Sequence, residues 1–393
     1  MNQLDEDYKG LLGSCLYNSI EKTDRTGTGT LSVFGRQIKH RMKDGFPLLT
    51  TKKMPFKTIV TELLWFLRGD TNIKYLVDNG CNIWNGDAYK KYWFNWRPMK
   101  EDCGEDLTPY TQEEFINRIK TDEEFAKQWG ELGPIYGKQW RSWGRKNVVN
   151  YDLENVKSSD RVKVMDLIRD GGDYSKYDVK VTYQNNSIDQ IANLINDLKT
   201  NPDSRRLMVN AWAVHDLPNM VLPPCHYAFQ VYTRELSLEE RRALVLKDTQ
   251  YTLPPSTNWT EDEIKEGKRQ LEEANIPTRA ISLMYNARSQ DVPLGTPFNI
   301  SSYALFLEII GRMVNMIPGE LISNMGDCHI YLNQIDGVKE LLKREPYDLP
   351  KLKISDSINF NGSIDDFLDS CDKNSFELED YKSHPAIKIP LSN

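Results

Sequence analysis

The sequence lacks the cysteine and histidine spacing that a structural metal site requires. It has five histidines and no CxxC pair, and its six cysteines are scattered at positions 15, 81, 103, 225, 328 and 371. Zinc sites bring such ligands together at short, recurring spacings. We therefore expect no metal, and we interpret the cysteines as reduced thiols rather than as a disulfide framework.

Long apolar runs and an excess of positive charge are missing as well. No apolar run reaches the roughly 18 residues of a membrane-spanning helix, and the acidic start, MNQLDEDYKGLLGS, lacks a signal-peptide pattern. We therefore expect a cytoplasmic protein without membrane contact. The net charge of −7 argues against a basic nucleic-acid surface, but it is compatible with a local pocket for a small anion.

Internal repeats and low-complexity tracts are also absent, and apolar segments alternate with charged ones. Apolar and polar residues in alternation predict strands, whereas apolar residues at helical spacing predict helices. The predicted strands cover residues 31–42, 206–214 and 226–233, and the predicted helices cover 56–69, 187–206, 299–319 and 332–346. We expect a Ser/Asp cap at the start of the second helix and a Pro-Gly end to the third.

Three charged stretches interrupt this pattern, at residues 86–128, 145–186 and 235–277. Each begins and ends near a strongly predicted element, and each is short for an independent hydrophobic core. We interpret them as surface insertions in a single domain that spans residues 1–393, rather than as linkers between domains.

The stretch VLPPCHYAFQVY, residues 221–232, places Cys225 after two prolines and directly before His226. Cysteine is among the most buried residue types, so one interpretation is a structural thiol followed by a core histidine. The other is a nucleophile, whose position the prolines would fix and whose thiolate would need positive neighbours. Because Cys225 and His226 are adjacent, the pair argues against a cysteine protease, in which the histidine normally comes from a distant part of the chain.

Arginines in three short motifs offer such positive neighbours. One interpretation is that these motifs are solvated turns. The other is a site for a phosphate dianion, because guanidinium groups donate to phosphate oxygens in pairs. The motifs are DRTGTG with Arg25, NPDSRR with Arg205 and Arg206, and ARSQD with Arg288. The glycines of the first do not form a P-loop, since no Gly-Lys-Ser/Thr follows.

Polar residues in apolar contexts are further candidates. Asn299 stands at the start of an apolar helix, either as its N-cap or as an amide that presents a donor and an acceptor to a uracil edge. Glu62 lies on an apolar helix, where it is either exposed or a functional buried carboxylate. His329 and Tyr331 face the same way in a strand, either as a buried pair or as joint ligands of a sugar hydroxyl.

Taken in order, the motifs resemble those of one enzyme family, the thymidylate synthases and the related deoxypyrimidine hydroxymethylases. The motifs that carry the resemblance are DRTGTGTLSVFG, FPLLTTKK, ELLWFLRGDTNI, GPIYGKQWR, NPDSRR, LPPCH, LGTPFNI, GDCHIY and SHPAIK. The resemblance extends from about Tyr8 to the C-terminus, interrupted by the three charged stretches. It implies an α/β fold in which a large bent sheet serves as the face of a homodimer and helices cover the rest.

The resemblance implies that Cys225 attacks C6 of dUMP and makes C5 a carbon nucleophile. Glu62 would organise water for proton transfers at O4, and Tyr136 would assist loss of the C5 proton. Asn299 would bind the uracil, which makes dCMP the less favoured nucleotide. The other implied nucleotide contacts are His226 and Gln230 near the base, His329 and Tyr331 at the deoxyribose, and Arg25, Arg288, Ser289 and, across a dimer interface, Arg205 and Arg206 at the phosphate.

The same resemblance implies 5,10-methylenetetrahydrofolate as cosubstrate. Asp291 would hold its pterin, and Lys52 would meet its glutamate tail. Trp84 and Leu222 would pack on the folate. The implied contacts are completed by Asn85 and Gly295.

The two branches of the family share every step up to a methylene group on C5 and then differ in what reaches it. Hydride gives thymidylate, whereas water gives 5-hydroxymethyl-dUMP, so exclusion of water decides the product. The chain departs from the synthase pattern at Asn85, where aspartate is usual, at Gln334, where histidine is usual, and at its polar end, Ser392 and Asn393. We therefore expect a dUMP hydroxymethylase, with thymidylate synthase as the alternative.

A further alternative is an inactive nucleotide-binding protein whose insertions dock a partner. Such a protein would have lost part of the active-site set. The set that the resemblance implies is intact, with Cys225, Glu62, Tyr136, Asn299 and Asp291 all present. The sequence therefore favours an enzyme.

Overall fold

The computed structural model describes residues 2–24, 26–103, 108–144, 148–184, 187–245 and 260–392. Its helices are α1 (Gln3–Tyr17), α2 (Phe56–Leu67), α3 (Lys74–Asp78), α4 (Asn85–Cys103), α5 (Gln112–Thr121), α6 (Glu123–Trp129), α7 (Tyr136–Arg141), α8 (Arg161–Arg169), α9 (Gln190–Thr200), α10 (Leu238–Val245), α11 (Glu261–Glu273), α12 (Gly295–Met313), α13 (Ile335–Leu342) and α14 (Ile364–Asp369). None of the helices in these ranges is both long and apolar enough to cross a membrane.

The strands are β1 (Ile20–Lys22), β2 (Thr30–Arg41), β3 (Val148–Asp152), β4 (Lys180–Gln184), β5 (Met208–Asn210), β6 (His226–Glu235), β7 (Arg279–Asp291), β8 (Ile317–Tyr331), β9 (Lys351–Ile354) and β10 (Phe376–Glu379). Short 3-10 turns lie at η1 (Met42–Asp44), η2 (Leu217–Asn219), η3 (Leu332–Gln334) and η4 (Lys373–Ser375). Two strand pairs, β9 with β10 and β3 with β4, stand outside the main sheet.

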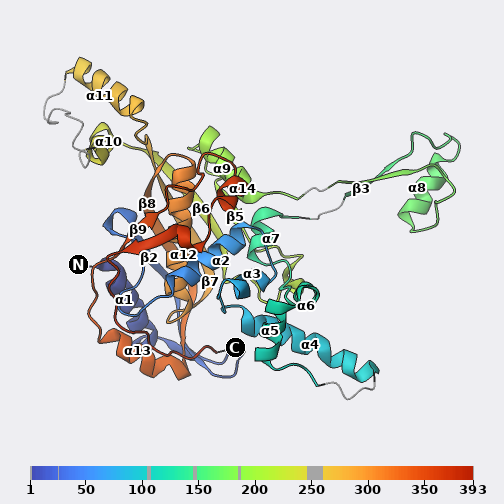
Figure 1. The fold of residues 1–393 in the computed structure, drawn as a ribbon, viewed down its shortest axis with the longest axis horizontal. Helices are drawn as coiled ribbons and strands as arrows, with labels where there is room; N and C mark the ends of the chain where they lie inside the picture. Colours follow the sequence, from blue (N-terminus) through green and yellow to red (C-terminus); the bar gives the residue numbers. More distant parts are fainter. Residues whose placement is uncertain are drawn as a thin grey trace.

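The main sheet has six strands in the order β1-β2-β8-β7-β6-β5 (Figure 1). Neighbouring strands are antiparallel except β7 and β8, which are parallel. A parallel pair needs a crossover connection, and α12 supplies it between these two strands. The large sheet and its covering helices confirm the expected α/β fold.

Helices α12 and α2 form the buried layer over one face of this sheet (Figure 1). Ten of the 12 residues of α2 and 14 of the 19 residues of α12 are buried. A helix that is apolar on nearly every side belongs to the interior of a protein. Because α2 is such a helix, any polar residue on it is carried into the core.

The opposite face of the sheet exposes large apolar side chains. On β6, Phe229 and Val231 are buried beneath α12, whereas Tyr232 points the other way and is 68% exposed. Met208 of β5 is 52% exposed, and Phe34 of β2 is 80% exposed. Exposed apolar surface on a sheet is typical of a face that another molecule covers.

Residues 86–128 contain most of α4 together with α5 and α6, although their charge predicted no regular structure. Aromatic side chains pack together here, and the ring centroid of Tyr92 lies 5.0 Å from that of Phe115 and 5.1 Å from that of Trp129. Phe115 and Ile119 belong to the main hydrophobic core. The segment therefore extends the core as well as the surface.

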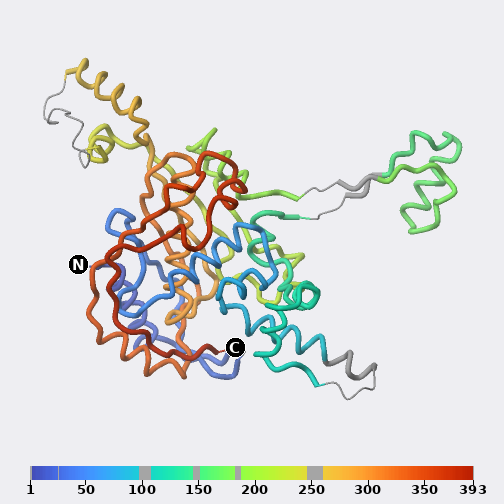
Figure 2. The backbone as a smooth tube through the Cα atoms, in the orientation of Figure 1, coloured from blue at the N-terminus to red at the C-terminus, as the bar shows by residue number. Residues whose placement is uncertain are grey.

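Within the charged segments 145–186 and 235–277, the described residues 148–184 and the helices α10 and α11 lie away from the main sheet (Figures 1 and 2). The first contains the antiparallel pair β3–β4 and helix α8, and two backbone hydrogen bonds of 2.9 and 2.8 Å between Trp143 and Ile188 close its base. The second contains α10 and α11, which pack against each other. Val164 of α8 is buried locally, outside the main core.

Most predicted elements lie where the sequence placed them, since α2, α9, α13 and β5 fall within their predicted segments. The N-cap of α9 is Asp189, as expected, and its carboxylate accepts a hydrogen bond from the Ala192 N–H. The boundaries of α12 differ. It begins at Gly295 rather than at residue 299, and the expectation that Pro-Gly ends it is wrong, because Pro318 lies within β8. Asn315, whose backbone has a left-handed conformation, ends the helical segment before the chain reaches Pro318.

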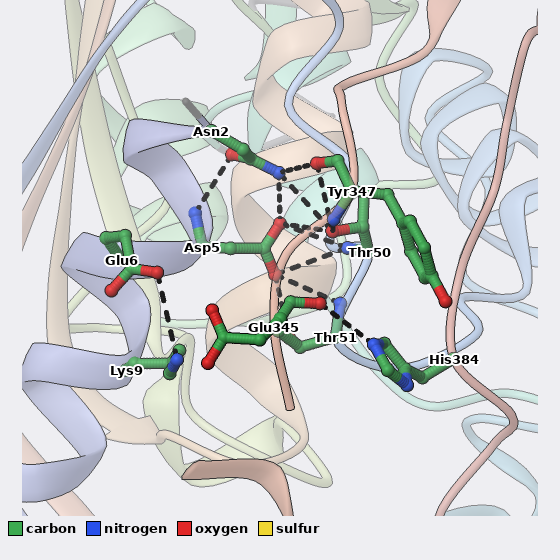
Figure 3. Close-up of polar contacts among 9 residues, drawn as sticks. All are labelled: Asn2, Asp5, Glu6, Lys9, Thr50, Thr51, Glu345, Tyr347 and His384. Atoms are coloured by element: carbon green, nitrogen blue, oxygen red, sulfur yellow. Dashed lines mark hydrogen bonds and ion pairs between the residues drawn. The ribbon is translucent and has the colours of Figure 1, made fainter. Parts of the chain in front are cut away.

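A buried carboxylate joins the N-terminal helix to the segment before α2. Asp5 of α1 is fully buried, and Figure 3 shows it among Asn2, Thr50 and Thr51. It accepts hydrogen bonds from the backbone N–H groups of Thr50 and Thr51, each at 3.1 Å, and from their hydroxyls at 2.9 and 2.7 Å. A buried carboxylate is tolerated where it is hydrogen-bonded in this way. The network fixes the segment that carries Lys52.

Replacing Asp5 by alanine should lower the free energy of unfolding by about 3 kcal/mol, because several buried donors lose their acceptor. Equilibrium unfolding in urea measures the change. Glu6→Ala on the same helix is the matched control, since Glu6 forms a partly exposed ion pair with Lys9 at 3.7 Å; it should cost less than about 1 kcal/mol. Equal losses in the two variants would contradict the role of Asp5.

Candidate active site

Cys225 stands at the point where the chain enters β6, and its backbone is fixed from two sides. Its N–H donates to the Tyr136 hydroxyl at 2.7 Å, and its carbonyl accepts from the Arg288 N–H at 2.8 Å. The pairing of β6 with β7 is irregular between His226 and Ala228, and such irregularities redirect side chains near functional sites. The thiol therefore has a defined position.

The burial of Cys225 distinguishes it from the other cysteines whose side chains the structure describes. It is half-buried, whereas Cys15, Cys81, Cys328 and Cys371 are buried. Burial raises the pKa of the thiols of Cys15, Cys81 and Cys328 to about 12, so they remain protonated. A purely structural role, one of the two interpretations of the sequence, describes those three cysteines better than it describes Cys225.

The guanidinium group of Arg288 supports the loop that precedes the cysteine. Its Nε donates to the Pro224 carbonyl and one of its terminal nitrogens donates to the Pro223 carbonyl, both at 2.9 Å. The group also lies 5.5 Å from the ring centroid of Trp212. These two bonds use two of the five N–H donors of an arginine, so the exposed side chain retains donors for an anion.

His226 is a buried, neutral imidazole. Burial lowers its pKa to about 3, its Nδ1 lies 2.9 Å from the Tyr303 hydroxyl, and its ring stacks on Tyr136 with centroids 4.3 Å apart. The interpretation as a satisfied core histidine therefore describes its environment. A neutral ring cannot supply the positive charge that a thiolate needs, so that charge must come from arginines.

Tyr136 is the first residue of α7 and is buried between the cysteine loop and α2. Burial raises the pKa of its phenol well above the usual value, so the hydroxyl stays protonated. The oxygen accepts the Cys225 N–H, and its own proton remains available as a donor. The phenol can therefore exchange protons with a molecule bound beside the thiol.

Glu62 lies on the buried side of α2, so the interpretation as an exposed residue is wrong. The carboxyl is 8% exposed, and the Trp84 Nε1–H donates to its Oε1 at 2.9 Å. Burial raises the pKa of Glu62 to about 7, although the bond from Trp84 lowers it. A carboxyl that titrates near neutral pH is suited to general acid–base work.

Aromatic rings connect the carboxyl to the thiol. The Trp84 and Tyr136 ring centroids lie 6.2 Å apart, with the rings nearly perpendicular. Tyr136 in turn contacts both His226 and the backbone of Cys225. The structure thus brings together buried residues of α2, α7 and β6 that are distant in the chain.

Asn299 lies in the second turn of α12 and does not cap it, because the N-cap is Leu294. Its Nδ2 donates to the Gln290 Oε1 at 3.2 Å, and Thr296 donates to the same oxygen at 3.3 Å. Gln290 is 1% exposed, and its Nε2 has no hydrogen-bond partner among the described residues. The amide of Asn299 is therefore oriented by a buried neighbour, which leaves its second N–H free to bind a ligand.

His329 and Tyr331 lie at the end of β8 on the same side of the strand, with their ring centroids 5.2 Å apart. The His329 Nδ1 lies 3.1 Å from the Asp327 carboxylate, which also accepts a hydrogen bond from Ser32 at 2.9 Å. Burial alone would raise the pKa of Asp327, but the bonds from Ser32 and Lys22 lower it. Sequence reasoning missed Asp327, although it stands two residues before His329 in the same strand.

Asp291 ends β7 and is held by two donors. Its Oδ1 accepts the Leu294 N–H and its Oδ2 accepts the Gln334 amide, both at 3.1 Å. Burial raises the pKa of Asp291 and lowers that of Lys52 to about 8. Lys52 is buried and donates to the Pro293 carbonyl, so the structure places its ammonium group in the interior, close to Asp291.

The other predicted site residues are spread along the chain. Leu222 precedes the cysteine loop, and Ser289 and Gln230 are half-buried on the sheet. The exposed Arg205 and Arg206 occupy the turn before β5, and Gly295 starts α12. Asn85 starts α4, and its Nδ2 donates to Asn82 at 3.1 Å. Arg25 lies outside the described residues.

A cavity of about 650 Å³ opens between the start of α4, the helix α5 and the C-terminal tail. Ile83 and Asn85 line one side of it, Ile116 of α5 lines another, and Leu391 of the tail lines a third. Cavities of this size hold molecules of several rings. The charged segment 86–128 therefore lines this cavity, which the sequence did not predict.

Comparisons with known proteins identify the family of the chain. The family model described as thymidylate synthase matches residues 6–393. The thymidylate synthase of Listeria monocytogenes serotype 4a (strain HCC23) is 38% identical over 405 residues, covering 98% of this chain and 99% of the relative. Those of Listeria innocua serovar 6a and Mycoplasma mobile are each 37% identical, with the same coverage. The chain belongs to the thymidylate synthase family, whose members are one-carbon transferases.

Burial of Glu62 predicts a pH-dependent stability. Its folded-state pKa of about 7 exceeds the ordinary value of 4.5, so the ionised form disfavours the fold and the free energy of unfolding falls as the pH rises through this window. The glutamine of Glu62→Gln cannot ionise. The free energy of unfolding of this variant, relative to that of the wild type, should therefore be about 2–3 kcal/mol larger at pH 8 than at pH 4. Urea unfolding at both pH values measures this gain.

The exposed Glu124 of α6 provides the control. Glu124→Gln makes the same chemical change at the surface. It should leave the wild-type difference in the free energy of unfolding between pH 4 and pH 8 unchanged. A gain of equal size at pH 4 and pH 8 for Glu62→Gln would show that Glu62 does not titrate in this range.

Proposed function

We propose that the protein is a thymidylate synthase, which converts dUMP and 5,10-methylenetetrahydrofolate into dTMP and dihydrofolate. The observation that carries the proposal is the fixed, half-buried Cys225 beside the protonated Tyr136, with Glu62 one aromatic ring away. The names of the relatives from Listeria monocytogenes and Mycoplasma mobile support the same activity. The expected dUMP hydroxymethylase lacks such support, and the alternative takes its place.

Two of the polar departures that favoured the hydroxymethylase, Gln334 and Ser392, have internal partners in the fold, whereas Asn393 lies outside the described residues. Gln334 donates to Asp291 and to the Pro390 carbonyl of the tail, at 3.1 and 3.0 Å. Ser392 exchanges hydrogen bonds with Asn333, at 3.1 and 3.3 Å. Both side chains hold the tail against the fold, and closing an active site expels water from the reacting carbon. These contacts support hydride transfer in a closed site.

The proposed chemistry begins at the thiolate. The Cys225 sulfur bonds to C6 of dUMP, and the electron pair of the C5–C6 double bond moves toward C5 and O4. Glu62, with a pKa near neutrality, exchanges a proton at O4 through water. Asn299 donates to the uracil with the N–H that Gln290 leaves free. Burial places the pKa of Glu62 near neutrality and keeps the Tyr136 phenol protonated, as these steps require.

The folate supplies the one-carbon unit and the hydride when it is bound. The nucleophilic C5 would bond to the methylene carbon as its bond to one folate nitrogen breaks. Loss of the C5 proton, with help from Tyr136, would break the bond to the other folate nitrogen and leave a methylene group on C5. Hydride from the tetrahydrofolate, which becomes dihydrofolate, would complete the methyl group as the sulfur departs from C6 and the C5–C6 double bond forms again. The cavity between Asn85 and Leu391 has the size for such a ligand. Asp291, oriented by Leu294 and Gln334, is the proposed acceptor for the pterin N–H groups.

A homodimer belongs to the same proposal. The exposed Tyr232 and Met208 on one face of the sheet form apolar surface that a second copy would cover. Arg205 and Arg206, exposed at the turn before β5, would then reach the phosphate bound by Arg288 of the other subunit. The single domain, the cytoplasmic location and the phosphate role of Arg25 remain predictions.

The product distinguishes the two branches of the family. Incubation of dUMP with methylenetetrahydrofolate should yield dTMP, by mass spectrometry, with one dihydrofolate formed per dTMP. Cys225→Ala should reduce turnover by at least about 10³-fold, because nothing replaces the covalent step, yet still bind dUMP. Cys371→Ala is the control and should remain active. 5-Hydroxymethyl-dUMP without dihydrofolate would refute the proposal, as would turnover by Cys225→Ala.

Mixing two inactive variants tests whether the arginines are shared. Cys225→Ala and the double variant Arg205→Ala/Arg206→Ala should each lack activity. After unfolding and refolding together, about half of the dimers are hybrids with one intact site, so about one quarter of the wild-type activity should return. Each variant refolded alone is the control. Arginines that act within their own subunit would leave the mixture inactive.

A further inference from the structure

The C-terminal tail runs along α13 and ends beside the proposed folate cavity (Figure 2). A Cβ atom on Gly337 would lie 2.9 Å from Ile389 Cγ1, so the tail approaches the helix as closely as a glycine allows. Ile389 is buried in the main core, and Leu391 lines the cavity. The last residues of the chain are therefore part of the wall of the site.

One buried amide, that of Gln334, joins this tail to the site. Gln334 is fully buried at the end of η3. Its Nε2 donates to the Asp291 Oδ2 at 3.1 Å and to the Pro390 carbonyl at 3.0 Å, while its Oε1 accepts the Tyr331 N–H at 3.0 Å. Both amide protons and the oxygen are thus engaged, with partners on β7, β8 and the tail.

Few other side chains can make this set of bonds. A primary amide offers two N–H donors and a carbonyl acceptor on one planar group. A neutral imidazole offers one donor and one acceptor, so it would lose either Asp291 or Pro390. A carboxylate offers no donor and would place a second negative charge against Asp291. The geometry therefore requires glutamine at this position, independent of pH.

We propose that Gln334 is a positioning residue that couples the closed C-terminal tail to the Asp291 carboxylate, and that this coupling orients the site for the folate. The inference rests on the proposed function for the identity of the ligand. The coupling itself rests only on the contacts of Gln334. Release of the tail leaves one N–H of Gln334 without its acceptor, and rotation of Asp291 leaves the other without one, so each contact helps to hold the amide in the orientation that the other contact requires.

Gln334→Glu tests the coupling, because it keeps the size of the side chain and makes the contact titratable. At low pH, the introduced carboxyl and Asp291 can share a proton, and the tail stays in place. As the pH rises both carboxyls ionise and repel each other. Between pH 6 and pH 8.5, the KM for methylenetetrahydrofolate of Gln334→Glu should rise about tenfold relative to the wild type, the effect of one buried hydrogen bond to a carboxylate. The KM for dUMP should change less than about threefold.

Other titratable groups face this contact in both proteins. Lys52 precedes α2, Tyr8 lies on α1 and His329 lies on β8, and each interacts electrostatically with Asp291. The comparison with the wild type at each pH removes their contribution. Gln3→Glu is the matched control, since the Gln3 amide donates to the Asp7 carboxylate at 2.8 Å on the exposed side of α1; it should leave both KM values unchanged.

Hydrogen exchange of the backbone N–H groups in residues 386–392 gives a readout that does not depend on turnover. Protection of this segment should fall as the pH rises in Gln334→Glu, beyond the change in the wild type. Gln334→Leu, which has no polar atoms, should lose protection equally at both pH values, and it serves if the glutamate variant does not fold. If residues 386–392 kept the hydrogen-exchange protection of the wild type in both variants, the proposed coupling would be overturned, whichever nucleotide the enzyme makes. A failed product assay together with lost protection would refute the proposed function and leave the coupling intact.

Discussion

The site depends on one constraint, the fixed backbone of Cys225. A hydroxyl from α7 accepts its N–H and an N–H from β7 donates to its carbonyl, so the cysteine cannot turn without breaking a contact to another element. The supporting residues are themselves held, Tyr136 by stacking on His226 and Arg288 by its bonds to the two prolines. Precise placement of a nucleophile lowers the activation free energy of its reaction with a bound partner by several kcal/mol. Here the sheet and two helices together place the cysteine.

Burial gives the surrounding groups their chemical character. The same removal from water raises the pKa of Glu62 to about 7 and lowers that of His226 to about 3, because it disfavours whichever form is charged. As a result the carboxyl can exchange protons near neutral pH, whereas the imidazole stays uncharged and serves as a stacking surface. Such burial opposes folding, and the buried helices α2 and α12 offset its cost through apolar packing.

The sequence predicted the role of a single polar residue reliably where its hydrogen-bond partner is near in the chain. It did so unreliably where the partner is far away in the chain. Asp189 was correctly predicted as a cap, because its acceptor role involves a residue three positions away. Asn299 was not a cap, because the helix begins earlier and the amide binds Gln290 on a strand. Gln334 and Ser392 suggested a water-accessible site, an inference that lacks support, and their hydrogen-bond partners, Asp291, Pro390 and Asn333, come from other parts of the fold.

The sequence by itself determined the positions of most helices and strands, the order of the motifs and therefore the family, because periodicity and turn chemistry act over a few residues. Only the tertiary structure decided that Glu62 is buried against Trp84, that the segment 86–128 reaches the cavity, and that the tail is joined to Asp291 through Gln334. Burial and hydrogen-bond partners depend on segments that are far apart in the chain, and no local pattern specifies which of them will meet.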